Sequence, residues 1–357
     1  MKNQTKLLGP LAVVLATVVV ATAFAQAPKP IKPFAKGVVT TIPIAPQDEE
    51  MFSGPRPLVE VPLTIDGLEY EPKIAPKTST VFEKAKIATL RRTIWNLEFS
   101  FKPMRMVYVD LPQPNGKLQR KLVWYMVYYV RNLGGHIRPL PQEEVVIKEA
   151  DVVDANGTKA GLTPGLVHVK YAKEATDEVE VFGKPSKELR FFPHFVLRST
   201  EYDKEYLDRV IPAALAPIKA REFPDRADVK LHDSLTISEV RIQKSDETND
   251  NRVWGVVTWI DVDPRIDYYT VFIQGLTNAY RFDDPEGAFK KGDQPGTGRK
   301  IVRKTLQLNF WRPGDTIDPS EEEIRYGCRM DSDKAEQAKI FAEFGIDKPI
   351  DHLWLYR

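Results

Sequence analysis

Hydrophobic and polar residues alternate along much of this chain, which is the pattern of β-strands that bury one face. Residues 95–101 are the clearest case, with tryptophan, leucine or phenylalanine at every second position. The run 122–130 is apolar at every position, which predicts a central strand covered on both faces. Asn115 and Gly116 separate two strand-like runs and predict a tight hairpin turn, because both residues tolerate positive φ.

Further strand-like runs, with turn residues between them, occur throughout the chain. They lie at 104–111, 144–153, 166–171, 178–182, 189–197, 236–244, 252–262, 268–274, 279–282, 301–311 and 323–327. Many short strands at this spacing are typical of β-sandwiches. We therefore expect a mainly β protein with two immunoglobulin-like β-sandwich regions, at residues 63–200 and 226–357.

Helical spacing of apolar residues appears in three places. Between residues 201 and 222 it is interrupted by Pro212, so we expect a helical junction over 201–225 made of two short helices kinked at this proline. Near the end of the second region, Asp333 is a good N-cap and Gly345 a good stop, which predicts a short C-terminal helix. Residues 80–92 also have apolar residues at helical spacing.

The first 25 residues have the features of a bacterial export signal. Lys2 and Lys6 give a positive start, residues 11–25 are an apolar run, and the small residues Ala23 and Ala25 suit a signal peptidase. We expect cleavage after Ala25 and export to the periplasm or cell surface. The alternative is an uncleaved inner-membrane anchor through residues 7–25, whose length approaches that of a bilayer span.

A proline-rich segment follows the signal. Residues 26–62 contain eight prolines and no apolar periodicity, which favours extended, polyproline-like structure. We expect a spacer between the envelope and the folded part of the chain. The alternatives are a strap that lies across the domain or a recognition segment.

Composition narrows the class of protein. The 357 residues are 42% hydrophobic and 28% charged, as in a globular protein of one large or two ordinary domains. The 51 basic and 50 acidic residues give no reason to expect nucleic acid as a partner, and loss of Lys2 and Lys6 changes the net charge from +1 to −1. The single cysteine, Cys328, cannot form an internal disulfide, so packing and strand pairing must hold the fold.

Aromatic residues are concentrated in the second β region. Rings on an exposed sheet face can stack on sugars or anchor a protein partner, and the alternative is a packed core. Trp311 stands next to a Pro-Gly turn, so of these rings it is the one most expected at the surface, with a core position as its alternative. Our candidate binding residues are Trp259, Tyr268, Tyr269, Trp311 and Arg312.

Three carboxylates, Asp261, Asp263 and Asp267, form a candidate metal site at the end of a strand. Oxygen ligands at such spacing can bind calcium. The EF-hand pattern is broken at Ile266, where that loop requires glycine. The alternative is an ordinary turn with an ion pair to Arg265. No cofactor is predicted.

Sequence motifs of catalysis are nearly absent. The glycine-rich residues 292–300 lack the spacing of a phosphate-binding loop, and the chain has no His-Glu-x-x-His or Gly-x-Ser-x-Gly segment. We expect Cys328 to be an inert thiol. A glycosidase needs only two nearby carboxylates; Glu98 and Asp261 are candidates, although exposure to solvent also accounts for both.

Two resemblances add to this reading. Residues 124–134, which read Trp-Tyr-Met-Val-Tyr-Tyr-Val-Arg-Asn-Leu-Gly, resemble a strand of bacterial immunoglobulin-like domains that ends in a Val-x-Asn-x-Gly turn. Residues 92–99, 274–280 and 309–315 are similar to a family of uncharacterised exported proteins from planctomycete bacteria. The second likeness spans most of the mature chain and implies export, without implying an activity.

These observations together favour an exported, non-catalytic envelope protein. Its expected partner is another envelope component, either a protein or a polysaccharide. The alternative is a carbohydrate-binding module or a carbohydrate-active hydrolase. Contact with the membrane is expected only if the N-terminal segment stays uncleaved.

Overall fold

The computed structural model describes residues 39–44, 46–53, 90–146, 167–181, 184–283, 297–312 and 324–357, with a few single residues between 285 and 293. This part of the chain is mainly β, as predicted. The predicted signal at 1–25 and residues 80–89 of the predicted helix lie outside it. Within the described residues, no helix combines the length and the apolar character that a membrane span requires.

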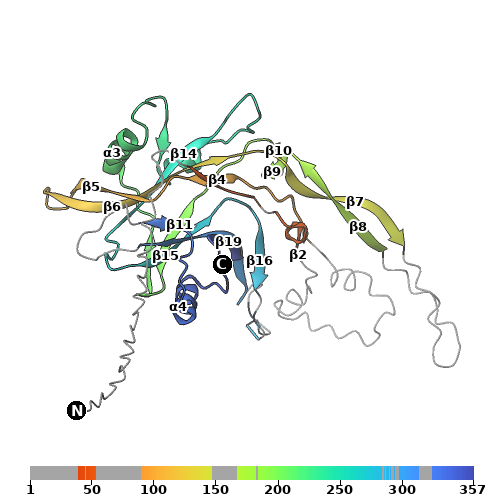
Figure 1. Ribbon diagram of the computed structural model, residues 1–357. Coiled ribbons are helices and arrows are strands. Elements are labelled where there is room, and N and C mark those ends of the chain that lie inside the picture. The colour runs from red at the N-terminus through yellow and green to blue at the C-terminus, as the bar shows by residue number, and fades with distance from the viewer. Residues whose placement is uncertain are drawn as a thin grey trace, which may run out of the picture. The chain divides into compact units, whose positions relative to one another are not determined.

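The first of two large sheets is built around one long strand, β6 (Leu118–Arg131). β5 and β6 form a hairpin around the predicted turn, where Gly116 has a φ of 76° (Figure 1). The strands lie in the order β1 (Thr40–Ile42), β4 (Glu98–Phe101), β6, β14 (Val253–Ile260) and β13 (Leu231–His232), and β5 (Arg105–Pro112) also pairs with β6.

The second sheet has β15 and β17 at its centre. Its order is β12 (Lys204–Leu207), β11 (His194–Ser199), β15 (Tyr268–Gln274), β17 (Lys300–Trp311) and β16 (Tyr280–Asp283). Along the same edge of β17, three strands pair in succession: β16, then β19 (His352–Tyr356), then β18 (Arg325–Tyr326).

Strands from both predicted β regions are present in both sheets. β14 pairs with β6 along its whole length, from Val253 opposite Val130 to Ile260 opposite Val123. In the second sheet, β11 pairs with β15. Strands that precede residues 201–225 in the sequence are therefore hydrogen-bonded to strands that follow them, in both sheets.

The two sheets enclose one aromatic core. The ring centroids of Trp124 and Tyr269 are 5.6 Å apart, and those of Tyr128 and Phe195 are 5.0 Å apart, so each pair joins the first sheet to the second. Alternate residues of β6, including Trp124, Met126 and Tyr128, face this core. This packing explains the large aromatic content of the chain.

The opposite face of β6 is covered by α3 (Pro212–Glu222), which lies beside the first sheet in Figure 1. Tyr125 packs there with Ala214 and Ile218 of the helix. A central strand covered on both faces was predicted and is confirmed. The helix begins at Pro212, as expected, but residues 204–207 form β12, so the first of the two predicted helices is absent from this position.

A buried charged cluster fixes the end of α3 to the sheet. Glu222 lies 3.3 Å from Nζ of Lys102 and 3.5 Å from Arg105, and the hydroxyl of Tyr125 donates to it over 2.8 Å. Burial lowers the pKa of Lys102, although Glu222 partly offsets this effect. The Glu222 carboxylate thus faces three buried donor groups, and Lys102 also donates to the Glu222 carbonyl over 2.7 Å.

Part of the predicted spacer belongs to the fold. β1 pairs with β4, and the short 3-10 helix η1 (Asp48–Met51) buries Glu50 and Met51. Nζ of Lys304 lies 2.6 Å from the Glu50 carboxylate, and the hydroxyl of Tyr356 donates to it over 2.7 Å. Residues 40–42 and 48–51 therefore behave as a strap across the domain, the alternative considered above.

Strand β4 departs from the expected alternation. All four of its residues are buried, including Glu98 and Ser100, which the sequence placed on a solvent face. Glu98 is satisfied by Arg131, directly opposite on β6, at 2.8 Å. Other parts of the chain cover the polar face of β4. The alternation of residues within the strand cannot predict this long-range contact.

The remaining elements complete the domain. α4 (Lys334–Phe344) is the predicted C-terminal helix: Asp333 caps it by accepting from the Ala335 amide over 2.8 Å, and Gly345 ends it with a φ of 65°. Three small antiparallel pairs are β2 (Phe52–Ser53) with β3 (Leu90–Arg91), β7 (His136–Val146) with β8 (Val167–Thr176), and β9 (Val179–Val181) with β10 (Lys184–Ser186).

Candidate functional site

Two of the five predicted binding residues lie in the core. Trp259 and Tyr269 are fully buried. Tyr269 stacks on Phe310, with ring centroids 5.5 Å apart, and its hydroxyl lies 3.2 Å from the Met104 sulfur. Neither ring can reach a surface ligand, so for these two residues the structure fits the core alternative.

Tyr268 and Trp311 lie directly opposite each other on the outer face of the second sheet. Because Tyr269 points into the core, its neighbour Tyr268 points away from it. Arg329 donates to the Tyr268 hydroxyl over 2.9 Å, and its guanidinium carbon is 5.9 Å from the centre of the Trp311 ring. Sequence reasoning missed Arg329, because no motif connects it with Trp311.

Arg312 is buried, with 3% of its surface exposed. Its backbone amide donates to the Asp267 carbonyl over 2.8 Å, and its guanidinium donates to the Pro264 carbonyl over 3.3 Å. The same guanidinium lies 5.4 Å from the centre of the Trp124 ring. These contacts hold the turn before β15 against the core, so Arg312 has a structural role in the described part of the chain.

The three predicted metal-binding carboxylates have separate environments. Asp263 accepts from Lys204 over 2.6 Å and from Arg265 over 2.8 Å, and these bonds hold its pKa well below the usual range. Asp261 pairs with Lys121 at 2.8 Å. Burial raises the pKa of Asp267. The described residues contain no group of three carboxylate, histidine or cysteine side chains suited to a metal ion.

A cavity of about 400 Å³ opens on the outer face of the second sheet. Thr270 and Phe272 of β15 and Gln307 of β17 belong to its lining. Its other lining residues are Arg198, Thr200, Ala342, Phe344, Gly345, Leu355, Tyr356 and Arg357. The lining combines aromatic rings with several polar side chains, which together can contact a small ligand.

Two arginines give the cavity a positive wall. Nε of Arg198 lies 3.7 Å from the Glu205 carboxylate, and Arg357 bonds the same carboxylate. The guanidinium carbon of Arg357 lies 4.3 Å from the centre of the Phe272 ring. The two guanidinium groups share the Glu205 carboxylate, and guanidinium N–H donors suit a ligand with a carboxylate or several hydroxyl groups.

Gln307 presents a fixed amide to this cavity. Its Nε2 donates to Oδ1 of Asn309 over 2.9 Å and to the Phe344 carbonyl over 2.8 Å. Both donors are therefore engaged, and the amide oxygen remains available as an acceptor. The site can thus combine an acceptor with the guanidinium donors of its positive wall.

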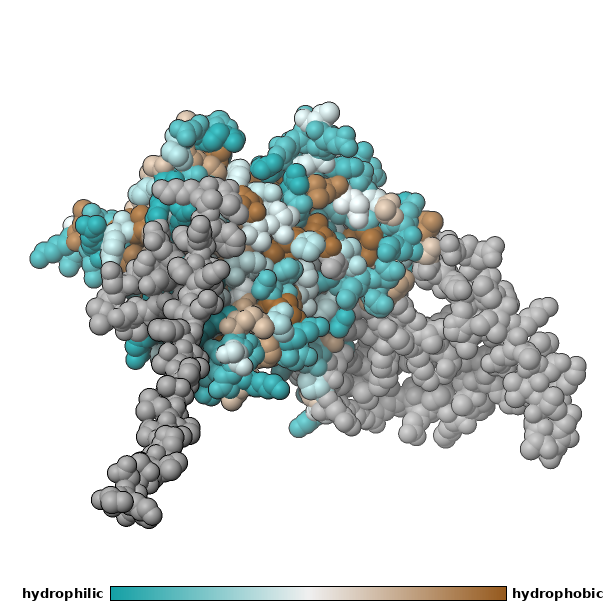
Figure 2. Space-filling view, in the orientation of Figure 1, coloured by the Kyte–Doolittle hydropathy of each residue, from teal (hydrophilic) through white to brown (hydrophobic). Residues whose placement is uncertain are grey.

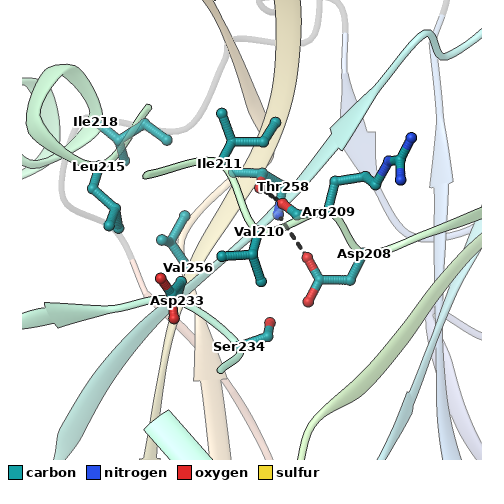
Figure 3. Close-up of a pocket in the computed structure, with 10 residues that line it drawn as sticks. All are labelled: Asp208, Arg209, Val210, Ile211, Leu215, Ile218, Asp233, Ser234, Val256 and Thr258. Carbon is teal, nitrogen blue, oxygen red and sulfur yellow. Dashed lines mark hydrogen bonds between the residues drawn. The ribbon is translucent and has the colours of Figure 1, made fainter. Parts of the chain in front are cut away.

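A second hollow lies where the chain passes from the second sheet to the first (Figure 3). The amide of Asp208 donates to the Phe195 carbonyl over 3.2 Å, and its carboxylate accepts from the Thr258 amide over 3.4 Å. Burial raises the pKa of Asp208, and the neighbouring Ser234 hydroxyl partly opposes this shift. The hollow is too narrow to admit a water molecule, so it is a structural junction.

The catalytic candidates of the sequence are not brought together. Glu98 lies opposite Arg131, and Ile260, which precedes Asp261, lies opposite Val123; these two β6 positions are eight residues apart, or roughly 26 Å along the strand. A glycosidase requires a separation of roughly 5–10 Å. Burial raises the pKa of the Cys328 thiol, which disfavours the thiolate that nucleophilic chemistry needs.

Comparisons of this chain with protein-family models, with curated proteins and with solved structures found no match. The likeness to exported planctomycete proteins therefore remains an expectation from the sequence. A function must accordingly be inferred from the cavity and from the residues around it.

Proposed function

We propose that this protein is an exported, non-catalytic protein of the bacterial cell envelope that binds another envelope component. The observation that carries the proposal is the cavity beside β15 and β17, with its two arginines and its aromatic rings. The ligand group that it fits is small and carries a carboxylate or several hydroxyl groups.

The lining of the cavity supports binding without catalysis. Among the described residues that line it, none has a carboxylate, thiol or imidazole side chain. Histidine, carboxylates and cysteine are common general acids, bases and nucleophiles in enzymes. Arginine, glutamine, threonine and aromatic side chains instead supply hydrogen bonds and stacking surfaces.

The surface supports a local rather than a broad binding site. On the face drawn in Figure 2, the apolar residues that the structure describes lie in separate spots among polar ones. Stable protein interfaces bury large, continuous areas. Recognition of one chemical group in a cavity agrees better with this distribution.

The proposal includes export of the chain and an immunoglobulin-like arrangement of its two sheets. The positive start, the apolar run and the small residues before Gln26 support export to the periplasm or cell surface. The two sheets around one core support an immunoglobulin-like arrangement. Sequencing of the mature N-terminus tests the export step: a start at Gln26 is expected, and a start at Met1 would contradict cleavage.

A carbohydrate-binding module is the second candidate. The observation that favours it is the half-buried Trp311 beside Tyr268, because ring faces on a sheet surface can stack on sugars. Arg329 holds Tyr268 in place through its hydroxyl.

One experiment separates the two candidates from a hydrolase. Purified protein is incubated with isolated envelopes and with a panel of polysaccharides, and both retention and release of reducing ends are measured. We expect retention on envelopes without release. Release of reducing ends that is abolished by a single Asp or Glu substitution would overturn the non-catalytic assignment. Retention on one polysaccharide that is lost in Trp311→Ala would favour the carbohydrate-binding module.

A further inference from the structure

Strands β7 and β8 form a two-stranded arm that belongs to neither large sheet (Figure 1). They pair from His136 opposite Thr176 to Val146 opposite Val167. The base of the arm is anchored by Ile137, which exchanges two backbone hydrogen bonds with Ile94, over 2.8 Å and 3.0 Å. An isolated pair of strands has little stability of its own in water. The two outer edges of the arm therefore show whether a further strand could pair with it and stabilise it.

The outer edge of β7 is blocked by prolines. The amide and carbonyl of Ile137 bond to Ile94 and therefore point away from β8. Backbone groups alternate in direction along a strand, so residues 139 and 141 also point to the outer edge. Both are prolines and have no amide donor. Proline on an edge strand prevents the addition of another strand.

The outer edge of β8 carries no proline. Ala175 lies opposite Ile137, so its backbone groups also point outward, away from the partner strand. None of the residues that share this direction is a proline, and no described residue bonds to their backbone groups. They are Val167, Val169, Tyr171, Lys173 and Ala175. A row of backbone donors and acceptors that no described strand pairs with is a template for an added strand.

We propose that β8 pairs with β8 of a second copy of this chain, in an antiparallel arrangement with its two-fold axis at Tyr171. All the outward residues of each copy then find a partner, and the two arms become one four-stranded sheet. The proline-bearing β7 strands become the outer edges of that sheet, which is where proline is tolerated. This inference does not depend on the cavity or its ligand.

The sequence of β8 is compatible with this register. The axis at Tyr171 places Glu174 opposite His168 of the second copy, and Lys170 opposite Ala172. Lys173 is placed opposite Val169. No residue of like charge is directly opposite another, so the pairing avoids the repulsion that would oppose a symmetric interface.

A proline substitution tests the interface, because it removes an amide that has no hydrogen-bond acceptor among the described residues. Lys173→Pro should raise the dissociation constant of the dimer about tenfold or more, measured by light scattering after size-exclusion chromatography. The matched control is Lys173→Ala, which keeps the amide and loses the same exposed ion pair with Asp48, 3.0 Å in length. We expect the control to remain dimeric.

The oligomeric state of the wild type and of the two variants tests the pairing through β8. A wild-type chain that stays monomeric at high micromolar concentration would overturn the proposal, as would a dimer that survives in Lys173→Pro or is lost in Lys173→Ala. If Lys173→Pro fails to fold, hydrogen exchange of the wild type replaces it. Protection of the Lys173 and Ala175 amides that increases with protein concentration is expected, and protection that is independent of concentration contradicts pairing through β8.

Discussion

Gly255 lies directly opposite Tyr128 where β14 pairs with β6. A Cβ atom at position 255 would stand 2.5 Å from Cζ of the tyrosine ring and 2.6 Å from its hydroxyl oxygen. The ring is fully buried between the two sheets. Glycine is therefore needed at 255 because the ring of Tyr128 fills the space above it.

This relationship predicts the effect of adding one methyl group. Gly255→Ala should lower the free energy of unfolding by about 1–3 kcal/mol, because the rigid ring must shift within a packed core. Urea unfolding measures the change. A double variant with Tyr128→Val should lose less stability than the sum of the two single variants. Strictly additive losses would contradict the proposed contact.

Asp208 gives a prediction about pH. Burial raises the pKa of its carboxyl above the ordinary value of 3.8, so the folded chain binds this proton more tightly than the unfolded chain does. The resulting stabilisation is fully present below the ordinary pKa and is lost as the pH rises through the raised one. The substitution Asp208→Asn keeps an acceptor for the Thr258 amide and removes the titrating group.

The stability of Asp208→Asn relative to the wild type should therefore increase as the pH rises above the ordinary carboxyl pKa of 3.8 and through the raised one. Urea unfolding of both proteins across this range provides the measurement. Asp228→Asn is the control: Asp228 is exposed and Arg226 lowers its pKa, so above the ordinary carboxyl pKa it is ionised in both states and the relative stability of its variant should stay constant. A difference for Asp208→Asn that falls with rising pH would be inconsistent with a raised pKa.

The pair of Glu50 and Lys304 gives a prediction about the N-terminal strap. Their side chains are 1% and 4% exposed, so removing one partner leaves a buried charge. Lys304→Met should cost about 3–5 kcal/mol of the free energy of unfolding. Lys339→Met, at a side chain 75% exposed, should cost about 0.5 kcal/mol or less. Similar losses in the two variants would argue against an integrated strap.

Local sequence signals predicted the elements whose causes are local. The Asn115-Gly116 turn, the doubly covered strand around Val127, and the helix between Asp333 and Gly345 depend on neighbours in the sequence. These features follow from positive φ, from continuous apolar character and from capping, and all three are present in the structure.

The pairing between distant segments could not be read in the same way. Tyr206 and Leu207 fit a helical pattern, yet they form part of β12 because β11 offers them hydrogen bonds. Trp259 and Tyr269 are buried in the core, whereas Trp311 is half-buried. Pairing between distant strands decides which face of a sheet each ring occupies. The cavity combines residues from Arg198 to Arg357, and no local pattern connects its parts.

Retention of the purified protein on isolated envelopes, compared between two tryptophan variants, tests the central claim most directly. Thr200 is an exposed residue of the cavity lining, so Thr200→Trp should block the cavity and lower retention about tenfold or more. Gln119→Trp adds the same ring at an exposed position of β6 and should bind as the wild type does. Equal retention of Thr200→Trp and the wild type would contradict binding through this cavity.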